Sequence, residues 1–281
     1  MFQINWKIKV IIYKILLILK AKKFLFFIQK NITKRAAVKI KNININWNYH
    51  LKQIKQHKCN SIFEFGAGKS LEQNIFLSYN SEGKLNQTVI DQSNMLDIKY
   101  FNNANEQISK ILNLKKKDNA KSNKDIKEIY NIEYIAPCSI EEVYKKNYTF
   151  DACISTATLE HLPKKDLEKI FQNLKKIIKK DGIISSLIDY SDHYSHTDKN
   201  IGPLNFLKFS SKDWAKYNNN YLFQNRLRHQ DFRKFFLDMN FEIIEEKKSS
   251  LGSPPKKISD EFEKNNDETF ILWGQFVLKN I

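Results

Sequence analysis

The sequence has little cysteine, glycine or proline, and this argues against several protein classes. Among 281 residues there are three cysteines, seven glycines and five prolines. An odd number of cysteines without a Cys-x-x-Cys pair argues against a disulfide framework or a cysteine zinc site and favours a reducing compartment. So few glycines and prolines exclude collagen-like and low-complexity chains. A hydrophobic fraction of 42% is enough for a large globular core.

Acidic residues are absent from the first 63 positions. That segment holds thirteen lysines and Arg35, so it carries +14 of the net charge of +16, and the rest of the chain is nearly balanced. The asymmetry suggests an anionic partner, either a membrane or a nucleic acid. The alternative is compositional bias, since lysine supplies 43 of the 47 basic residues and asparagine and isoleucine are abundant as well.

Residues 2–30 are apolar but lack a run long enough to span a bilayer. Lysines at positions 7, 9, 14, 20, 22 and 23 interrupt the segment, whereas a spanning helix needs about 20 apolar residues. Two interpretations stand: a helix in the membrane interface with snorkelling lysines, or a helix docked on the protein core or a second subunit. We expect residues 1–57 to form a basic, apolar helical extension. The expected location is cytoplasmic or peripheral at the inner face of the cell membrane, and no nucleic-acid module is readable.

From residue 58 onwards, strand and helix patterns alternate. We expect strands at 61–65, 87–90, 132–136, 150–155, 183–188, 241–247 and 269–278, and helices at 71–79, within 102–131, and at 166–179 and 230–239. This order predicts an α/β fold over residues 58–281: a doubly wound, Rossmann-like sheet of seven strands, mostly parallel with an antiparallel edge strand. The polar and aromatic segment 190–229 is expected to form a substrate lid over the carboxyl ends of the strands.

The turn after the first expected strand reads Glu64-Phe65-Gly66-Ala67-Gly68-Lys69-Ser70. A P-loop would need glycine at Phe63, and a dinucleotide fingerprint would need glycine at Leu71. An acidic residue two positions before the first glycine would repel a pyrophosphate. It suits a ligand with a cationic aminoacyl group.

These residues, with others further along, resemble the class I S-adenosylmethionine (SAM)-dependent methyltransferases. Asp91 closes the second strand 23 residues after Gly68, and Asp151–Ser155 is followed by Leu159-Glu160-His161-Leu162, similar to the fourth-strand motif of that family. The family's third glycine is replaced near Lys69, and its acidic residue after the third strand is missing. The resemblance implies SAM as cofactor, bound by Glu64, Gly66, Ala67, Gly68, Asp91, Gln92, Ser139, Ile140, Ser155, Thr156 and His161.

Histidines follow the fifth expected strand, where the transferred methyl group would lie. A hydroxyl acceptor has a high pKa and gains from a general base that titrates near neutrality. His193 is the first candidate for this base, with His196 and His229 behind it. Asp189 or Asp192 would orient one of these rings. Two alternatives stay open: a divalent metal held by Asp189, Asp192, His193 and His196, although their spacing is no recognised metal signature, or a solvated loop.

Three of the four arginines, Arg226, Arg228 and Arg233, cluster in a chain that otherwise uses lysine. Arginine makes bidentate contacts to phosphate or carboxylate, so we expect an acceptor site formed by Asp189, Asp192, Trp214, Arg226 and Arg228. The alternatives are structural ion pairs with Asp231 or Asp238 and a lid core formed by the aromatic residues.

Segments 192–196, 205–210 and 225–229 resemble a bacterial methyltransferase subgroup associated with surface-polysaccharide assembly. The expected partner is therefore a small-molecule or glycan acceptor, methylated at a sugar hydroxyl. Methylation of nucleic acid or protein is an alternative, although residues 155–158 lack an Asn-Pro-Pro-Tyr-type signature. An inactive binding module is another. The sequence leaves the oligomeric state open.

Overall fold

The structure is a computed structural model that describes residues 3–19, 21, 38–81 and 83–281. Its strands are β1 (Ser61–Phe65), β2 (Asn86–Ile90), β3 (Ile132–Ile135), β4 (Phe150–Thr156), β5 (Ile178–Asp189), β6 (Phe241–Lys248) and β7 (Trp273–Asn280). Its α-helices are α1 (Trp6–Ile18), α3 (Ile45–Gln56), α4 (Glu72–Asn80), α5 (Ile98–Leu112), α6 (Asn123–Tyr130), α7 (Ile140–Lys145), α8 (Lys164–Ile177), α9 (Ser211–Trp214) and α10 (His229–Asp238). Among the described residues, no helix is long and apolar enough to cross a membrane.

The seven-stranded sheet that the sequence predicts is confirmed. Its strand order is β3-β2-β1-β4-β5-β7-β6. β1 to β5 run parallel, whereas β7 lies antiparallel between β5 and β6. The chain leaves β1 towards β2 and β3 and then returns to β4, so the topological switch point lies between β1 and β4. Ligands of open α/β sheets bind at this point, beside the carboxyl ends of the strands.

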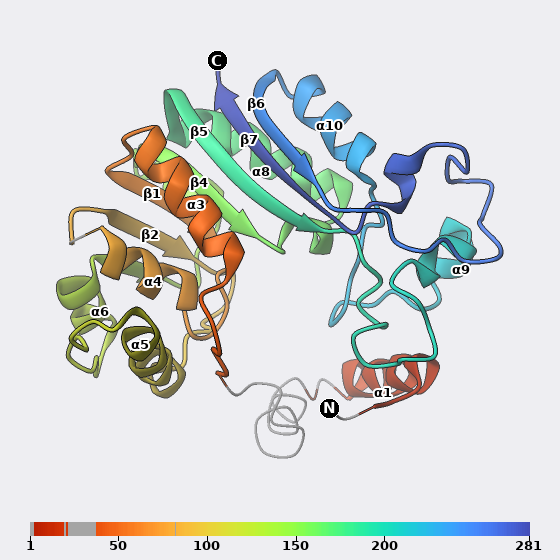
Figure 1. The fold of residues 1–281 in the computed structure, drawn as a ribbon, viewed down its shortest axis with the longest axis horizontal. Coiled ribbons are helices and arrows are strands. Elements are labelled where there is room, and N and C mark those ends of the chain that lie inside the picture. Colours follow the sequence, from red (N-terminus) through yellow and green to blue (C-terminus); the bar gives the residue numbers. More distant parts are fainter. Residues whose placement is uncertain (1–2, 20, 22–37, 82) are drawn as a thin grey trace.

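Helices cover both faces of the sheet (Figure 1). Successive strand residues point to opposite faces, so Ile62 packs with α3, α4 and α5, while Phe63 packs with α8 and α10. The first face also includes Trp47 of α3, which lies in the predicted extension but packs into the core beside the sheet. Because both faces are apolar, the strands have the continuous hydrophobic pattern that is typical of a buried parallel sheet.

The sequence predicts a helix over residues 166–179 that is stopped by Asp181-Gly182, and a strand that starts at residue 183. This prediction is wrong, because Gly182 lies within β5. Helix α8 passes directly into β5 at Ile178, four residues earlier than the glycine. A Cβ on Gly182 would lie 2.8 Å from the Asp151 carbonyl oxygen and 2.8 Å from a methyl group of Ile178. Glycine is therefore required because two backbone segments approach closely at a β-bulge. The two short helices α6 and α7 are likewise absent from the sequence-based prediction.

The segment 190–229, which the sequence predicts to be a substrate lid and which we call the lid, is irregular and has a core of its own. Tyr194, Phe206 and Trp214 are buried there, together with Trp6 and Val10 of α1. The backbone N–H of Trp6 donates a hydrogen bond of 2.9 Å to Asp198. Helix α1 therefore docks on the lid rather than on the sheet (Figure 1). The prediction of a helical extension over residues 1–57 lies outside the described residues at positions 1–2, 20 and 22–37.

Candidate functional site

A hollow of about 340 Å³ lies at the predicted switch point, within the size range of small-molecule sites. It is lined by Phe65, Gly66, Ile90, Asp91, Gln92, Ser93, Met95, Cys138, Ser139, Ile140, Thr158, Leu162 and Ile170. These residues follow the carboxyl ends of β1, β2, β3 and β4, with Ile170 contributed by α8. Two larger hollows, of about 520 and 550 Å³, lie elsewhere and have mainly lysines and other polar side chains around them.

The turn after β1 brings backbone rather than side chains to this hollow. Gly66 and Gly68 have φ angles of +74° and +81°, which glycine adopts without strain. The Gly66 N–H donates to the Ile90 carbonyl, which holds the turn against the end of β2. A Cβ at Gly66 would lie 3.0 Å from the Thr158 side chain, so a side chain here would crowd the mouth of the hollow.

Asp91 provides the principal charged group of the hollow. Its carboxylate accepts a hydrogen bond of 2.9 Å from the Tyr134 hydroxyl, and its own carbonyl accepts one from the Cys138 N–H. Burial raises the pKa of Asp91 to about 6, although the Tyr134 hydrogen bond lowers it. The carboxylate is therefore held rigidly and is ionised at neutral pH, where it can accept hydrogen bonds from a vicinal diol.

Ser139 and Ile140 border the same hollow at the start of α7. The Ser139 hydroxyl forms a capping box with Glu142, since it accepts from the Glu142 N–H while Glu142 accepts from the Ser139 N–H. This cap leaves Ile140 as an apolar surface at the rim. An aromatic ring system fits beside Ile140 and the other apolar groups here, Phe65, Met95 and Leu162.

Three imidazole rings lie together beyond the ends of β4 and β5. The ring of His193 is 4.8 Å from that of His161 and 4.9 Å from that of His196. Asp189 Oδ2 lies 3.3 Å from His193 Nε2 and 4.0 Å from His196 Nε2. Burial lowers the pKa of both His161 and His196, and the neighbouring His193 adds to this effect. The two rings are therefore neutral, proton-accepting groups at pH 7.

Comparisons with known proteins agree with this geometry. The family model described as "Methyltransferase domain" matches residues 101–186, which extend from α5 into β5. A search of curated proteins finds no match. The sheet has the Rossmann-like α/β arrangement with an antiparallel edge that the sequence predicts. SAM, the cofactor that the sequence predicts, agrees with the match to a methyltransferase domain.

Several solved methyltransferases are similar to this chain. An S-adenosylmethionine-dependent methyltransferase from Clostridium acetobutylicum is 13% identical, covers 92% of this chain and 98% of its own, and has a TM-score of 0.45. Magnesium protoporphyrin IX methyltransferase from Synechocystis, solved with bound SAH, is 12% identical over 87% and 88%, with a TM-score of 0.48. TehB from Haemophilus influenzae is 15% identical over 91% and 66%, with a TM-score of 0.46. This chain spans only 55% and 54% of two further methyltransferase chains.

Five of the residues predicted to bind cofactor line the hollow: Gly66, Asp91, Gln92, Ser139 and Ile140. The other six, Glu64, Ala67, Gly68, Ser155, Thr156 and His161, are not among its lining residues. Sequence reasoning missed the apolar wall formed by Phe65, Met95, Cys138, Leu162 and Ile170. Phe65 and Leu162 adjoin motifs that the sequence does reveal, whereas Ile170 reaches the hollow only through the packing of α8.

Glu64 faces the protein interior within this methyltransferase fold. Its carboxylate accepts hydrogen bonds from the Gln73 and Asn74 side-chain amides of α4, at 3.1 and 2.7 Å. Burial raises the pKa of Glu64 to about 7, while these two hydrogen bonds oppose the shift. Thr156 likewise turns inward, where it bonds His50 of α3 and Gln73. Glu64 thus joins β1 to α4, and Thr156 joins β4 to α3 and α4.

The arginines predicted to bind the acceptor have structural roles instead. Arg228 is 1% exposed, and its guanidinium donates to the carbonyl oxygens of Thr269, Tyr190 and Ile271. Arg226 donates to two lid carbonyls and to Ser211 in a similar way. Both guanidinium groups are buried and bonded to protein oxygens, so neither is placed to recognise a further anion. The alternative of structural ion pairs accounts for part of the cluster, but with acids other than Asp231 and Asp238. Arg233 pairs with Glu246 and Glu268, and Arg226 Nη2 lies 3.6 Å from Glu261.

Three further predicted residues are enclosed by the core. Trp214 is 2% exposed and packs among the aromatic rings of the lid. Asp192 is fully buried and accepts from the Tyr194 N–H and the Asn205 side chain, so it does not join Asp189 and the histidines. His229 is fully buried between Glu246 and Tyr190, at 2.6 and 3.1 Å. The histidine positions of the lid therefore divide into one enclosed ring and the cluster around His193.

Proposed function

We propose that this protein transfers the methyl group of SAM to an oxygen atom of a small-molecule or glycan acceptor, most specifically a sugar hydroxyl. The observation that carries the proposal is the pairing of two sites. The hollow contains a rigid carboxylate, Asp91, and the imidazole cluster lies beside it, because Thr158 and Leu162 of the hollow flank His161. The hollow suits a ribose diol that carries an apolar ring, and the imidazole cluster suits removal of a proton from the acceptor.

In this proposal, SAM lies across the ends of β1 and β4. Asp91 accepts hydrogen bonds from both ribose hydroxyls, and the adenine rests near Ile140. The turn containing Gly66 and Gly68 holds the aminoacyl end, as the resemblance to class I methyltransferases implies. The sulfonium then faces the lid. Binding energy is used mainly to align the acceptor oxygen, the methyl carbon and the sulfur for in-line displacement.

His196 is the base that the geometry favours. Its side chain is 54% exposed, whereas that of His193 is 11% exposed and enclosed by neighbouring rings. The acceptor oxygen attacks the methyl carbon, the carbon–sulfur bond breaks to leave S-adenosylhomocysteine, and the hydroxyl proton passes to neutral His196. Asp189, 4.0 Å from its Nε2, stabilises the imidazolium that forms. The base role thus moves from His193, the first candidate in the sequence, to its more accessible neighbour.

The outer face of α1 suggests where the acceptor is met. Ile8, Ile11, Ile12, Ile15, Ile18 and Leu19 are between 37% and 80% exposed and follow one helical stripe. The opposite face is docked on the lid. An exposed aliphatic stripe in a lysine-rich segment suits the interface of an anionic membrane. We propose that α1 places the lid at a membrane surface, where lipid-linked glycans are presented.

The test is methyl transfer by the full-length chain. SAM and a panel of free and lipid-linked glycans are incubated with the protein, and S-adenosylhomocysteine is measured. We expect His196→Ala to lower kcat about 100-fold or more, the usual contribution of a general base, with the KM for SAM unchanged. His57→Ala, which changes a histidine on the far side of the sheet at the end of α3, is the control.

Two outcomes would contradict the proposal. Binding of SAM without transfer to any acceptor of the panel would favour a binding module. Methyl transfer to nucleic acid or protein but not to glycans would support the reaction and contradict the proposed acceptor.

The pH dependence of kcat tests the role of His196 as the base. Because the pKa of His196 is lowered, kcat should fall only when the pH drops below about 6.5, as the imidazole becomes protonated.

A further inference from the structure

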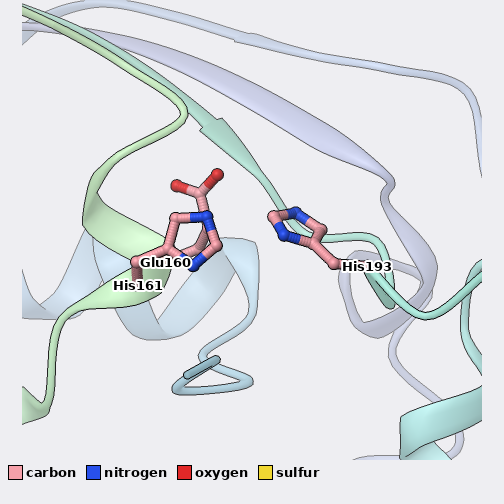
Figure 2. Close-up of side chains that lie close together, drawn as sticks. All are labelled: Glu160, His161 and His193. Atoms are coloured by element: carbon pink, nitrogen blue, oxygen red, sulfur yellow. The ribbon is translucent and has the colours of Figure 1, made fainter. Parts of the chain in front are cut away.

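A carboxylic acid and two imidazoles converge outside the cofactor hollow. Glu160 and His161 lie in a 3₁₀ helix after β4, and His193 lies in the loop after β5. One ligand atom from each residue lies within 4.8 Å of the other two. Figure 2 shows the carboxyl group and both rings gathered between these segments. A metal ion with ligands at 2.0–2.2 Å needs a spacing of at most about 4.4 Å, so small side-chain rotations suffice.

Glu160 is the group whose surroundings require a ligand. Its side chain is 3% exposed, and neither carboxyl oxygen has a hydrogen-bond partner among the described residues. Buried polar atoms are almost always satisfied in folded proteins, so both oxygens need either water or a cation. A cavity of about 10 Å³ adjoins Glu160, and this is the space of one water molecule. Neither His161 nor His193 lines this cavity.

The two rings are oriented as metal ligands usually are. The Nδ1 of His161 contacts the Phe223 carbonyl oxygen at 2.8 Å, and since a carbonyl only accepts, Nδ1 carries the proton. Its Nε2 then presents a lone pair. Asp189 Oδ2 lies 3.3 Å from one nitrogen of His193 and leaves the other for a ligand. A carbonyl behind one histidine and a carboxylate behind the other are the outer contacts that fix ligating imidazoles.

A second cluster of similar composition has its carboxylate charges neutralised by a side chain of the protein. His229, Glu246 and Glu268 also bring three ligand atoms together. There His229 Nε2 contacts Glu246 at 2.6 Å, and Arg233 forms ion pairs with both carboxylates. The guanidinium already supplies the positive charge, so this second cluster has no need of an ion. No lysine or arginine forms an ion pair with Glu160 among the described residues.

We propose that Glu160, His161 and His193 bind one divalent transition-metal ion. Two imidazole nitrogens and one carboxylate oxygen suit ions such as Zn²⁺, Co²⁺ or Mn²⁺ better than Ca²⁺ or Mg²⁺, which prefer oxygen ligands. Three protein ligands leave coordination positions for water or an acceptor. If the proposed methyl transfer holds, an acceptor hydroxyl bound there would be acidified by the ion and would lie close to His196. Metal binding itself does not depend on that function.

The test is metal binding by the full-length chain without SAM or acceptor. Chelator-treated protein is titrated with Co²⁺ and followed by visible absorption, and with Zn²⁺ in a calorimeter. We expect one equivalent to bind. Glu160→Gln and His193→Ala should each weaken binding at least 10-fold, whereas the control His57→Ala should leave it unchanged. Binding that is absent, or equally strong in all three variants, would overturn the proposal.

A second measurement uses only the wild-type chain, in case a variant fails to fold. Substoichiometric Mn²⁺ broadens the NMR signals of protons close to it. We expect the ring signals of His161 and His193 to broaden first, followed by that of His196, and that of His57 last. Equal broadening of all the histidines would mean surface binding only and would contradict the site. Because neither experiment measures methyl transfer, failure of the metal site and failure of the proposed function are distinguishable.

Discussion

At the scale of single residues, hydrogen-bond partners separate structural charges from functional ones. Arg228 is as buried as Glu160, but its guanidinium hydrogen bonds are to three backbone carbonyls, so the protein itself solvates its charge. Asp91 is also buried, yet it accepts a hydrogen bond from one neighbouring side chain, Tyr134, and faces a hollow. A buried charge with spare hydrogen-bonding capacity next to a cavity is where a ligand is expected.

Glu64 gives a prediction at this scale, through Glu64→Gln. Its folded-state pKa of about 7 exceeds the ordinary value of 4.5, so between pH 4.5 and 7 the folded chain holds a proton that the unfolded chain has lost. The free energy of unfolding therefore falls as the pH rises through this window, by up to about 3 kcal/mol. In the variant, the free energy of unfolding should not fall over this window. The difference in the free energy of unfolding, variant minus wild type, should therefore be about 1–3 kcal/mol larger at pH 8 than at pH 5. Urea unfolding of both proteins at the two pH values measures it.

The same variant tests the cofactor role that the sequence suggests. Because Glu64 bonds Gln73 and Asn74 and does not line the hollow, SAM affinity should change less than about threefold. A tenfold loss of SAM affinity, with the pH dependence of stability unchanged, would restore the role of Glu64 as a ligand of the aminoacyl group.

Single residues of the site could be predicted only in part. Asp91 and Gly66 are recognisable because a strand-ending acid and a glycine turn leave a local signature in the sequence. Tyr134 leaves none, since its role depends on which strands become neighbours. The arginine cluster was visible, but the sequence does not tell whether a guanidinium meets a ligand or a carbonyl. In Arg228 that depends on three carbonyls from residues 190–271.

At the scale of elements, long periodic segments were predictable and short ones were not. The buried strands and the amphipathic helix α8 have patterns that are read over many residues. Helix α7 has six residues and follows directly from the cap at Ser139, so its periodicity covers less than two turns. The start of β5 was misplaced because Asp181-Gly182 is typical of a helix end, whereas here the glycine accommodates a close approach of two strands.

Gly182→Ala tests this explanation at the level of the element. The added methyl group would meet the Asp151 and Lys179 carbonyl oxygens at 2.8 and 2.9 Å, both of them backbone atoms that cannot rotate away. We expect a loss of about 1–3 kcal/mol in the free energy of unfolding. Gly202→Ala is the matched control, because nothing lies within 4 Å of its added Cβ. Urea unfolding that shows the same change for both variants would contradict the close approach.

At the scale of the whole molecule, the charge and the apolar surface are concentrated at the N-terminal end. The sequence reveals the charge asymmetry, but not which side of α1 is free. That helix is apolar on both sides, with Trp6 and Val10 docked on the lid and the isoleucine stripe exposed. A helix of this kind has no clear polar face, so hydrophobic periodicity alone does not assign its orientation.

Vesicle co-sedimentation tests the membrane proposal for α1. The triple variant Ile11→Ser, Ile15→Ser, Ile18→Ser removes three exposed side chains without touching the docked face. We expect it to reduce binding to phosphatidylglycerol vesicles about tenfold or more, since each buried apolar side chain contributes roughly 1.5–3 kcal/mol. Leu237→Ser, which changes an exposed leucine on α10, should have no effect. A dimer that dissociates in the triple variant, with unchanged vesicle binding, would mean that a second copy covers the stripe.

The central claim is that the hollow between β1, β2 and β4 binds SAM through Asp91. Titration calorimetry of the full-length chain with SAM and with S-adenosylhomocysteine tests it most directly. We predict one binding site per chain, an affinity 10- to 100-fold weaker in Asp91→Ala because hydrogen bonds to a charged carboxylate contribute about 1.5–3 kcal/mol, and no change in the surface control Asp118→Ala. Absence of binding in the wild type, or equal affinity in Asp91→Ala, would contradict the claim.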